Sequence, residues 1–173
     1  EMSGLMNEHT QAGIEIFGYP AKEAVYEAIA SAKASLDKAD IPSYQFEFSH
    51  AGISQTIFDD LNLPAAAEKE LDLALKDKNI TQLNELTKKY PSEFDDFLKN
   101  LPYLFGESHQ VLSKARKLVK NESVLAALTD LEDLLAQVSD ILPESNIDLA
   151  QIPSMPYYTG VMFKVFGDKV PDA

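Results

Sequence analysis

Residues 64–143 restrict the fold more than any other stretch, because they combine an almost complete lack of glycine with helical spacing of apolar side chains. Gly106 is the only glycine there, and leucine, isoleucine and phenylalanine recur every three or four residues. The pattern breaks near Asn79, which is suited to cap a helix, and again at Pro91. The stretch therefore predicts a series of helices that pack their apolar stripes against one another. Binding of a partner by these stripes is the alternative.

The segments on either side of this stretch alternate between apolar and polar residues, which is the period of a β-strand. Gln11–Gly18, Ser43–His50 and Ile147–Ile152 show this alternation. Helical spacing over Pro20–Asp40 and Ile53–Leu61 predicts two helices between the first strands. Strands and helices together predict an α+β protein with a predominantly antiparallel sheet flanked by helices.

The order of these elements predicts a domain interrupted by an insertion. Residues 1–63 form the first part of the α+β domain, residues 64–143 form the helical insertion, and residues 144–173 return to the sheet. The sequence begins with Glu1 rather than with Met, which suggests that it starts within a longer protein.

The stretch from Pro156 to Phe166 carries the strongest chemical meaning. Tyr158 and Gly160 alternate with Tyr157 and Thr159 along a predicted strand, so the two tyrosines are expected on opposite faces. A glycine inside a strand packs no side chain and often marks the close approach of a ligand or of another backbone. These side chains would suit a small polar ligand on a sheet, and an ordinary core strand is the alternative.

Charge and composition exclude several classes of function. The 173 residues include 28 acidic and 15 basic side chains, a formal charge of −13, which disfavours nucleic acid as a partner. The basic run Lys114–Lys117 with Lys120 is interpreted as a solvated helix face. There is no cysteine, and His9, His50 and His109 are widely separated, so neither a metal site nor a cofactor is predicted.

No stretch has the apolar length of a membrane span, and no basic-then-apolar segment resembles a signal peptide. The sequence therefore predicts a cytoplasmic protein without membrane contact. Glu15 stands out within the first alternating segment, because a carboxylate there must face solvent, pair with a neighbour or bind a ligand.

Two of these segments resemble one known family. The residues from Pro156 to Phe163 are similar to the Tyr-Tyr-Thr-Gly-x-x-Phe signature of the histidyl-tRNA synthetase superfamily, which has the class II synthetase fold. His9–Gly18 is similar to the strand that follows the motif 2 loop in the same superfamily, usually Phe-x-Gln-x-Gly-x-Glu-x-x-Gly. The superfamily also includes the regulatory subunit of ATP phosphoribosyltransferase.

The resemblance implies a set of residues that bind histidine. In the synthetases the residue that matches Gln11 contacts the α-amino group, and the residue that matches Glu15 contacts the imidazole. The tyrosine that matches Tyr158 also reaches the ring. With their neighbours in the signature, the histidine-binding residues implied are Gln11, Glu15, Tyr157, Tyr158, Thr159 and Gly160.

One departure from the synthetase pattern decides between the branches of the superfamily. Synthetases have Arg-Gly-Leu-Asp before the paired tyrosines, whereas this chain has Pro153-Ser154-Met155-Pro156. Proline cannot replace the charge with which that arginine stabilises the carboxylate and phosphate during activation. The resemblance thus implies a non-catalytic regulatory subunit in histidine biosynthesis, which assembles with the ATP phosphoribosyltransferase catalytic subunit, self-associates and takes free histidine as its effector. A fragment of a histidyl-tRNA synthetase and a structural helical interaction module are the alternatives.

Overall fold

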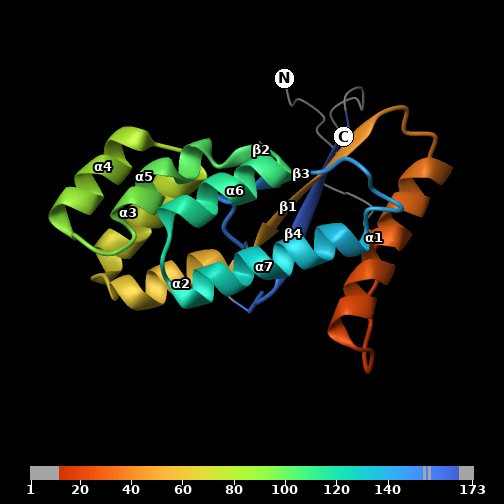
Figure 1. Cartoon of the computed structure of the whole chain (residues 1–173), viewed down its shortest axis with the longest axis horizontal. Helices are drawn as coiled ribbons and strands as arrows, with labels where there is room; N and C mark the ends of the chain where they lie inside the picture. The colour runs from red at the N-terminus through yellow and green to blue at the C-terminus, as the bar shows by residue number, and fades with distance from the viewer. Residues whose placement is uncertain (1–11, 154, 156, 168–173) are drawn as a thin grey trace, which may run out of the picture. The chain divides into compact units, whose positions relative to one another are not determined.

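The computed structural model describes residues 12–153, 155 and 157–167, and it divides into two compact units, Glu1–Ala39 and Asp40–Ala173 (Figure 1). In the first unit the helix α1 spans Ala21–Lys38, as the helical spacing predicted. Residues 12–17 precede it without regular structure, so the strand predicted over Gln11–Gly18 is wrong for the described part of that segment. A strand needs a neighbouring strand to pair its amide groups, and the described residues of this unit supply none.

The second unit contains a four-stranded sheet in the order β2-β3-β1-β4. β1 (Tyr44–His50) pairs antiparallel with β4 (Val161–Gly167) along its whole length, and β2 pairs antiparallel with β3. β1 and β3 run parallel. The short strands are β2 (Phe105–Glu107) and β3 (Asn146–Asp148).

The helices of the second unit follow the helical spacing in the sequence. They are α2 (Ala51–Leu61), α3 (Ala65–Lys76), α4 (Ile80–Lys89), α5 (Asp95–Asn100), α6 (Ser108–Leu118) and α7 (Glu122–Gln137), with a 3₁₀ turn over Leu101–Tyr103. The Asn79 side chain accepts a hydrogen bond from the amide of Gln82 at 3.1 Å, which confirms the predicted cap of α4. None of the described helices is both long and apolar enough to cross a bilayer.

Two strand predictions differ from the structure in extent. The strand expected over Ile147–Ile152 is only three residues long, because Asp148 turns the chain by accepting the amide of Ala150 through its side chain at 3.0 Å. The stretch 64–143 was expected to be a series of helices separate from the sheet, yet β2 lies within it and adds a strand to the sheet. Backbone pairing with β3, including Gly106 opposite Ile147, holds a segment that has no alternating pattern of its own.

The core lies between one face of the sheet and the helices. Phe46 and Phe48 of β1 are 1% and 0% exposed, and both rings contact Phe163 of β4 at centroid distances of 5.5 and 6.0 Å. Helix α7 contacts β1 and runs beside α2 (Figure 1). Burial of Phe46 and Phe48 against the half-buried Phe163 removes apolar area from water and thereby stabilises the unit.

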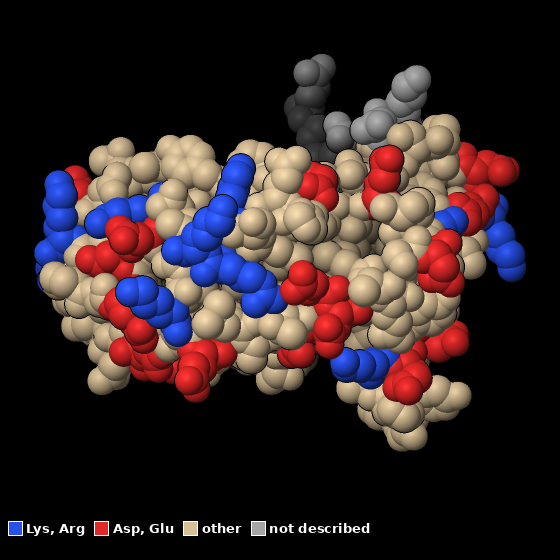
Figure 2. All heavy atoms as spheres, viewed as in Figure 1, with Lys and Arg blue, Asp and Glu red and all other residues tan. Residues whose placement is uncertain are grey.

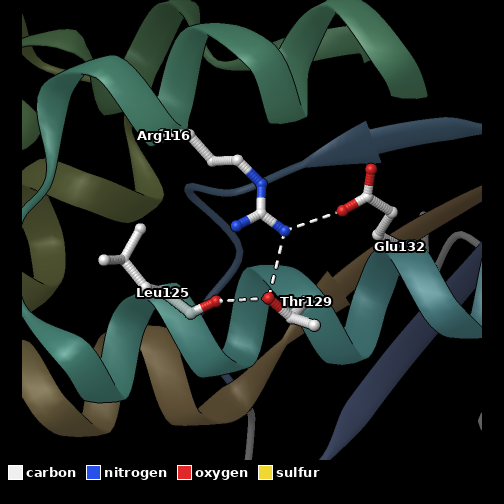
Figure 3. A network of polar contacts seen from close by, with 4 residues as sticks. All are labelled: Arg116, Leu125, Thr129 and Glu132. Atoms are coloured by element: carbon white, nitrogen blue, oxygen red, sulfur yellow. Dashed lines mark hydrogen bonds and ion pairs between the residues drawn. The ribbon is translucent and has the colours of Figure 1, made fainter.

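One basic side chain of α6 joins that helix to α7 (Figure 3). Arg116 donates to the Thr129 hydroxyl at 3.1 Å and pairs with the Glu132 carboxylate at 2.7 Å, while Thr129 donates to the Leu125 carbonyl at 3.0 Å. Lysine and arginine side chains gather over α6 on the face that Figure 2 shows. The basic run is therefore a helix face, as predicted, and Arg116 on it also links two helices.

Candidate functional site

The strand that carries the signature begins later than its alternation predicted. β4 starts at Val161, and Tyr157–Gly160 form an irregular loop before it. The amide of Tyr158 donates to the Met155 carbonyl at 3.3 Å, which closes a turn. Pro156 stands between Met155 and Tyr158 in the sequence, and proline lacks an amide donor and favours turns, so the chain joins the sheet only after this turn.

Two hydrogen bonds hold this loop against the start of α2. The amide of Ala51 donates to the Gly160 carbonyl at 2.9 Å. The side-chain amide of Gln55 donates to the Tyr158 carbonyl. The loop is thus fixed through its backbone, and its side chains remain available for other contacts.

The two tyrosines lie side by side, which contradicts the prediction that they point to opposite faces. Their ring centroids are 5.0 Å apart, with 43° between the ring planes. Alternation applies only to extended backbone, and the turn removes it. Tyr157 is 70% exposed and Tyr158 is 45% exposed, so neither is a core residue, and the reading of this stretch as an ordinary core strand fails at the tyrosines.

The glycine that is crowded is Gly52 and not Gly160. A Cβ atom added to Gly160 would meet no atom within 4 Å, whereas one added to Gly52 would lie 3.0 Å from the ring of His50. The Nδ1 atom of His50 accepts the amide of Gly52 at 3.0 Å and thereby caps α2. The close approach expected at Gly160 therefore occurs at Gly52 instead, where the His50 ring lies against a backbone that has no side chain.

His50 is a structural residue with a perturbed charge state. Burial lowers the pKa of its imidazole below the usual value, and this outweighs the opposing effect of Asp130, whose carboxylate is 3.7 Å from Nε2. The cap requires an unprotonated Nδ1, and the positive end of the helix dipole also disfavours a charged imidazole there. The neutral ring thus satisfies the first turn of α2.

A cavity of about 350 Å³ lies beside the tyrosine loop. One side is formed by Gln151, Ile152 and Pro153, and the other by Tyr158 and residues 161–164 of β4. Its volume is within the range of roughly 300–1,000 Å³ that is usual for small-molecule sites. The cavity is the place in the described residues where the signature meets a space large enough for a ligand.

A polar cluster adjoins this cavity through Gln151, which lines the cavity and also contacts Glu47 on the face of β1 opposite Phe46 and Phe48. Glu47 accepts a hydrogen bond from the side-chain amide of Gln151 at 2.6 Å. Asp148 pairs with Lys78 at 2.8 Å, and Lys78 also lies over the Phe105 ring at 4.4 Å. Lys78, at the corner between α3 and α4, thereby connects the helical region to the sheet.

The carboxyl group of Glu47 is held in an unfavourable environment. Burial raises its pKa above the usual value, and repulsion from Asp148 raises the pKa further. The hydrogen bond from Gln151 and the charges of Lys78 and Lys164 act in the opposite direction without cancelling the rise. Sequence reasoning missed this group, although its position between Phe46 and Phe48 on an alternating strand gives the signal.

A second unfavourable group lies one position further along the same face. Ser49 of β1 is 0% exposed, and its hydroxyl oxygen has no hydrogen-bond partner among the described residues. It lies opposite Met162 of β4, which lines the cavity. An unpaired buried hydroxyl is costly, so this part of the sheet is not optimised for stability alone.

The remaining predicted site residues belong to the first unit or lie outside the description. Gln11 lies outside the described residues. Glu15 lies in the irregular segment before α1, in the first unit, whereas Tyr157, Tyr158 and Thr159 are brought together in the loop of the second unit. The role of Gln11 and Glu15 in histidine binding stays a prediction.

A larger cavity of about 410 Å³ lies between α6, α7 and the start of β3, and its polar groups serve the fold. The Glu107 carboxylate caps α6 by accepting the amides of His109 and Gln110 at 2.9 and 3.0 Å, which lowers its pKa. The Ser108 hydroxyl donates to the Ser145 carbonyl at 2.6 Å. Within the described part of the chain, no group of three acidic, histidine or cysteine side chains could hold a metal ion.

Comparison with known proteins matches this geometry to one family. The family model described as Histidyl-tRNA synthetase matches residues 3–173, and thus nearly the whole chain. The chain belongs to the histidyl-tRNA synthetase family. It therefore has the class II synthetase-like α+β fold that the two motifs predicted, with the tyrosine loop leading into the edge strand of the described sheet.

Curated relatives carry a more specific name. The ATP phosphoribosyltransferase regulatory subunit of Streptococcus thermophilus is 58% identical over 173 residues, which are all of this chain and 53% of that protein. The subunit of the same name from Listeria monocytogenes serovar 1/2a is 35% identical over 172 residues, covering 99% of this chain and 44% of the relative. The chain thus spans about half the length of the curated relatives it matches.

Solved structures have the same fold. A protein from Bacillus halodurans described as an ATP phosphoribosyltransferase regulatory subunit/histidyl-tRNA synthetase superimposes with a TM-score of 0.70 at 26% identity, covering 86% of this chain and 40% of that chain. A chain of the ATP phosphoribosyl transferase (HisG:HisZ) complex from Thermotoga maritima gives a TM-score of 0.65 at 16% identity, covering 86% and 52%. The second likeness extends the fold to distant sequences.

Proposed function

We propose that this chain is part of a non-catalytic regulatory subunit of ATP phosphoribosyltransferase, acting in histidine biosynthesis. The observation that carries the proposal is the 58% identity to the regulatory subunit of Streptococcus thermophilus, which extends over all 173 residues. The same name accompanies relatives at 35% identity. By this proposal the protein assembles with the catalytic subunit into a hetero-oligomer, self-associates and works in the cytoplasm.

The absence of catalysis is argued from the cavity beside the tyrosine loop. Pro153 lines that cavity at the position where the synthetase pattern has an arginine. Activation of an amino acid develops negative charge on its carboxylate and on the attacking phosphate, which requires a fixed positive charge. Proline offers neither a charge nor a side-chain donor, so the cavity is suited to bind a ligand and is poorly suited to activate one.

Free histidine is the effector that this proposal assigns to the protein. By the resemblance, Gln11 and Glu15 contact its α-amino and imidazole groups and Tyr158 contacts the ring. Tyr158 lines the cavity, whereas Tyr157 is the more exposed of the two tyrosines. Binding would then serve feedback regulation, because the concentration of the end product of the pathway would control the enzyme complex that begins it.

The first test asks whether the protein activates histidine. Pyrophosphate exchange dependent on histidine and ATP is measured with the full-length protein, with a histidyl-tRNA synthetase as positive control. We expect no exchange above background. Stimulation of a purified short-form catalytic subunit by the full-length protein is measured in parallel. Exchange at synthetase rates without such stimulation would support the synthetase assignment instead.

The second test addresses the histidine-binding residues. A carboxylate that accepts the imidazole N–H makes a charge-assisted hydrogen bond worth roughly 1.5–3 kcal/mol, so Glu15→Gln should weaken histidine binding by about one to two decades. Calorimetric titration of the full-length protein with histidine measures this effect. Tyr103→Phe, at an exposed tyrosine that does not line the cavity, is the matched control and should leave the affinity nearly unchanged. A Glu15→Gln protein that melts at a different temperature but binds histidine as before would remove Glu15 from the site.

A further inference from the structure

One charged side chain lines the cavity beside the tyrosine loop, and no direct partner of it lies among the described residues. Lys164 of β4 is the only charged residue among those that line the cavity. Within the described residues Lys164 makes no hydrogen bond and no ion pair. A lysine ammonium group carries three donors, and a cavity wall that presents it favours an anionic group on the ligand.

The charge of Lys164 acts on Glu47, yet the contacts of Glu47 leave Lys164 without a direct ion pair among the described residues. Glu47 lies directly opposite Lys164 in the ladder between β1 and β4, so the two side chains share a face of the sheet. The Glu47 carboxylate is instead engaged by the Gln151 amide at 2.6 Å. The Glu47 carboxylate, which faces Lys164 across the two strands, thus accepts a hydrogen bond from Gln151 and makes no ion pair with Lys164.

We propose that Lys164 binds the carboxylate of the amino acid that occupies this cavity, a proposal that rests on the histidine-binding function proposed above. Pro153, at the arginine position of the synthetase pattern, and Lys164 line the same cavity. Lys164 therefore supplies a positive charge to a cavity whose opposite wall lacks the arginine. A single flexible ammonium can hold a ground-state carboxylate but does not present the rigid, two-pronged donor set of a guanidinium.

This assignment makes a specific chemical prediction. Ligands that keep the imidazole and the amine but lack the carboxylate should bind more weakly, and the difference should depend on Lys164. Histamine has this structure. Because Lys164 is exposed at one side, screening by water limits the effect, and we expect about a tenfold preference for histidine over histamine from this contact.

The experiment is calorimetric titration of the full-length protein with histidine and with histamine. In Lys164→Met the affinity for histidine should fall about tenfold and that for histamine should stay constant, so the preference disappears. Lys164→Arg keeps the charge and should retain most of the preference. Lys69→Met, an exposed lysine of α3 away from the cavity, is the matched control and should change neither affinity.

The possible results separate the two proposals. Equal loss of histidine and histamine affinity in Lys164→Met would mean that Lys164 only supports the fold, and the carboxylate contact would be wrong while histidine binding stood. An unchanged histidine affinity in Lys164→Met would overturn the contact in the same way. No binding of histidine by the unmodified protein, measured with circular dichroism confirming a folded sample, would overturn the histidine function and this inference together.

Discussion

The two faces of β1 are made from adjacent residues and have opposite physical character. On one face Phe46 and Phe48 are completely buried, stack on each other and pack against the tilted ring of Phe163 in the neighbouring strand. On the other face Glu47 is held with a raised pKa, and Ser49 has a buried hydroxyl without a partner. The difference shows that the sheet separates its tasks by strand alternation: one face stabilises the unit, and the other retains groups that cost stability.

The costly groups of the polar face also indicate where a binding site lies. Groups whose environment is unfavourable persist in proteins mainly where they serve a purpose, because evolution readily replaces a costly side chain that has none. The costly groups on the polar face lie next to the cavity that Tyr158 and Lys164 line. Mutations on the two faces should therefore have opposite effects on the free energy of unfolding.

Phe48→Ala should produce the largest change. The ring is 0% exposed and contacts both Phe46 and Phe163, so its removal leaves a cavity and should lower the free energy of unfolding by about 3–5 kcal/mol. Urea denaturation followed by circular dichroism measures the loss. Phe166→Ala is the matched control on the same sheet, because that ring is 54% exposed, and it should cost only about 0.5 kcal/mol. Equal losses in the two variants would contradict the assignment of the core to one face.

Ser49→Ala should have a smaller effect of the opposite sign. It removes a buried hydroxyl that has no hydrogen-bond partner, so the free energy of unfolding should rise by about 1 kcal/mol. Ser108→Ala is the matched control, since its hydroxyl donates to Ser145, and its loss should cost about 1 kcal/mol. Destabilisation by Ser49→Ala similar to that of the control would mean that the Ser49 hydroxyl has a partner in solution.

The sequence predicted the apolar face well and the polar face poorly, and the reason is physical. Burial of Phe46 and Phe48 follows from alternation, and the cap at Asn79 follows from the side chain itself, so both are local. The pairing of Glu47 with Gln151 joins residues 104 positions apart and depends on the packing of the chain. Alternation also failed at Tyr157 and Tyr158, because a turn closed by Met155 and Tyr158 replaced the strand that the residue types favour.

The family motifs predicted more of the fold than periodicity did. Two short matches indicated the class II synthetase-like architecture, including a sheet interrupted in sequence by helices, and the family model supports the same assignment over residues 3–173. They could not indicate Lys164, because it is not part of either motif. Its place in the cavity is visible only once β4 is set beside the segment from Gln151 to Pro153.

Glu47→Gln should give the smallest change in the free energy of unfolding, and this change should appear only above about pH 4.5. The pKa of Glu47 is higher in the folded protein than its ordinary value of 4.5, so the folded state retains a proton that the unfolded state has already released. Stability is therefore lost as the pH rises from about 4.5 through the folded pKa, and the full loss persists at neutral pH.

A glutamine at position 47 keeps an oxygen for the Gln151 amide and removes the charge that Asp148 repels. The variant should accordingly be more stable than the unmodified protein at pH 7 and equal to it at pH 4, as measured by denaturant unfolding across that range. If the curves for Glu47→Gln and the unmodified protein ran parallel from pH 4 to pH 7, the polar face would not hold its carboxylate at a cost, and the contrast between the two faces of β1 would reduce to one of burial alone.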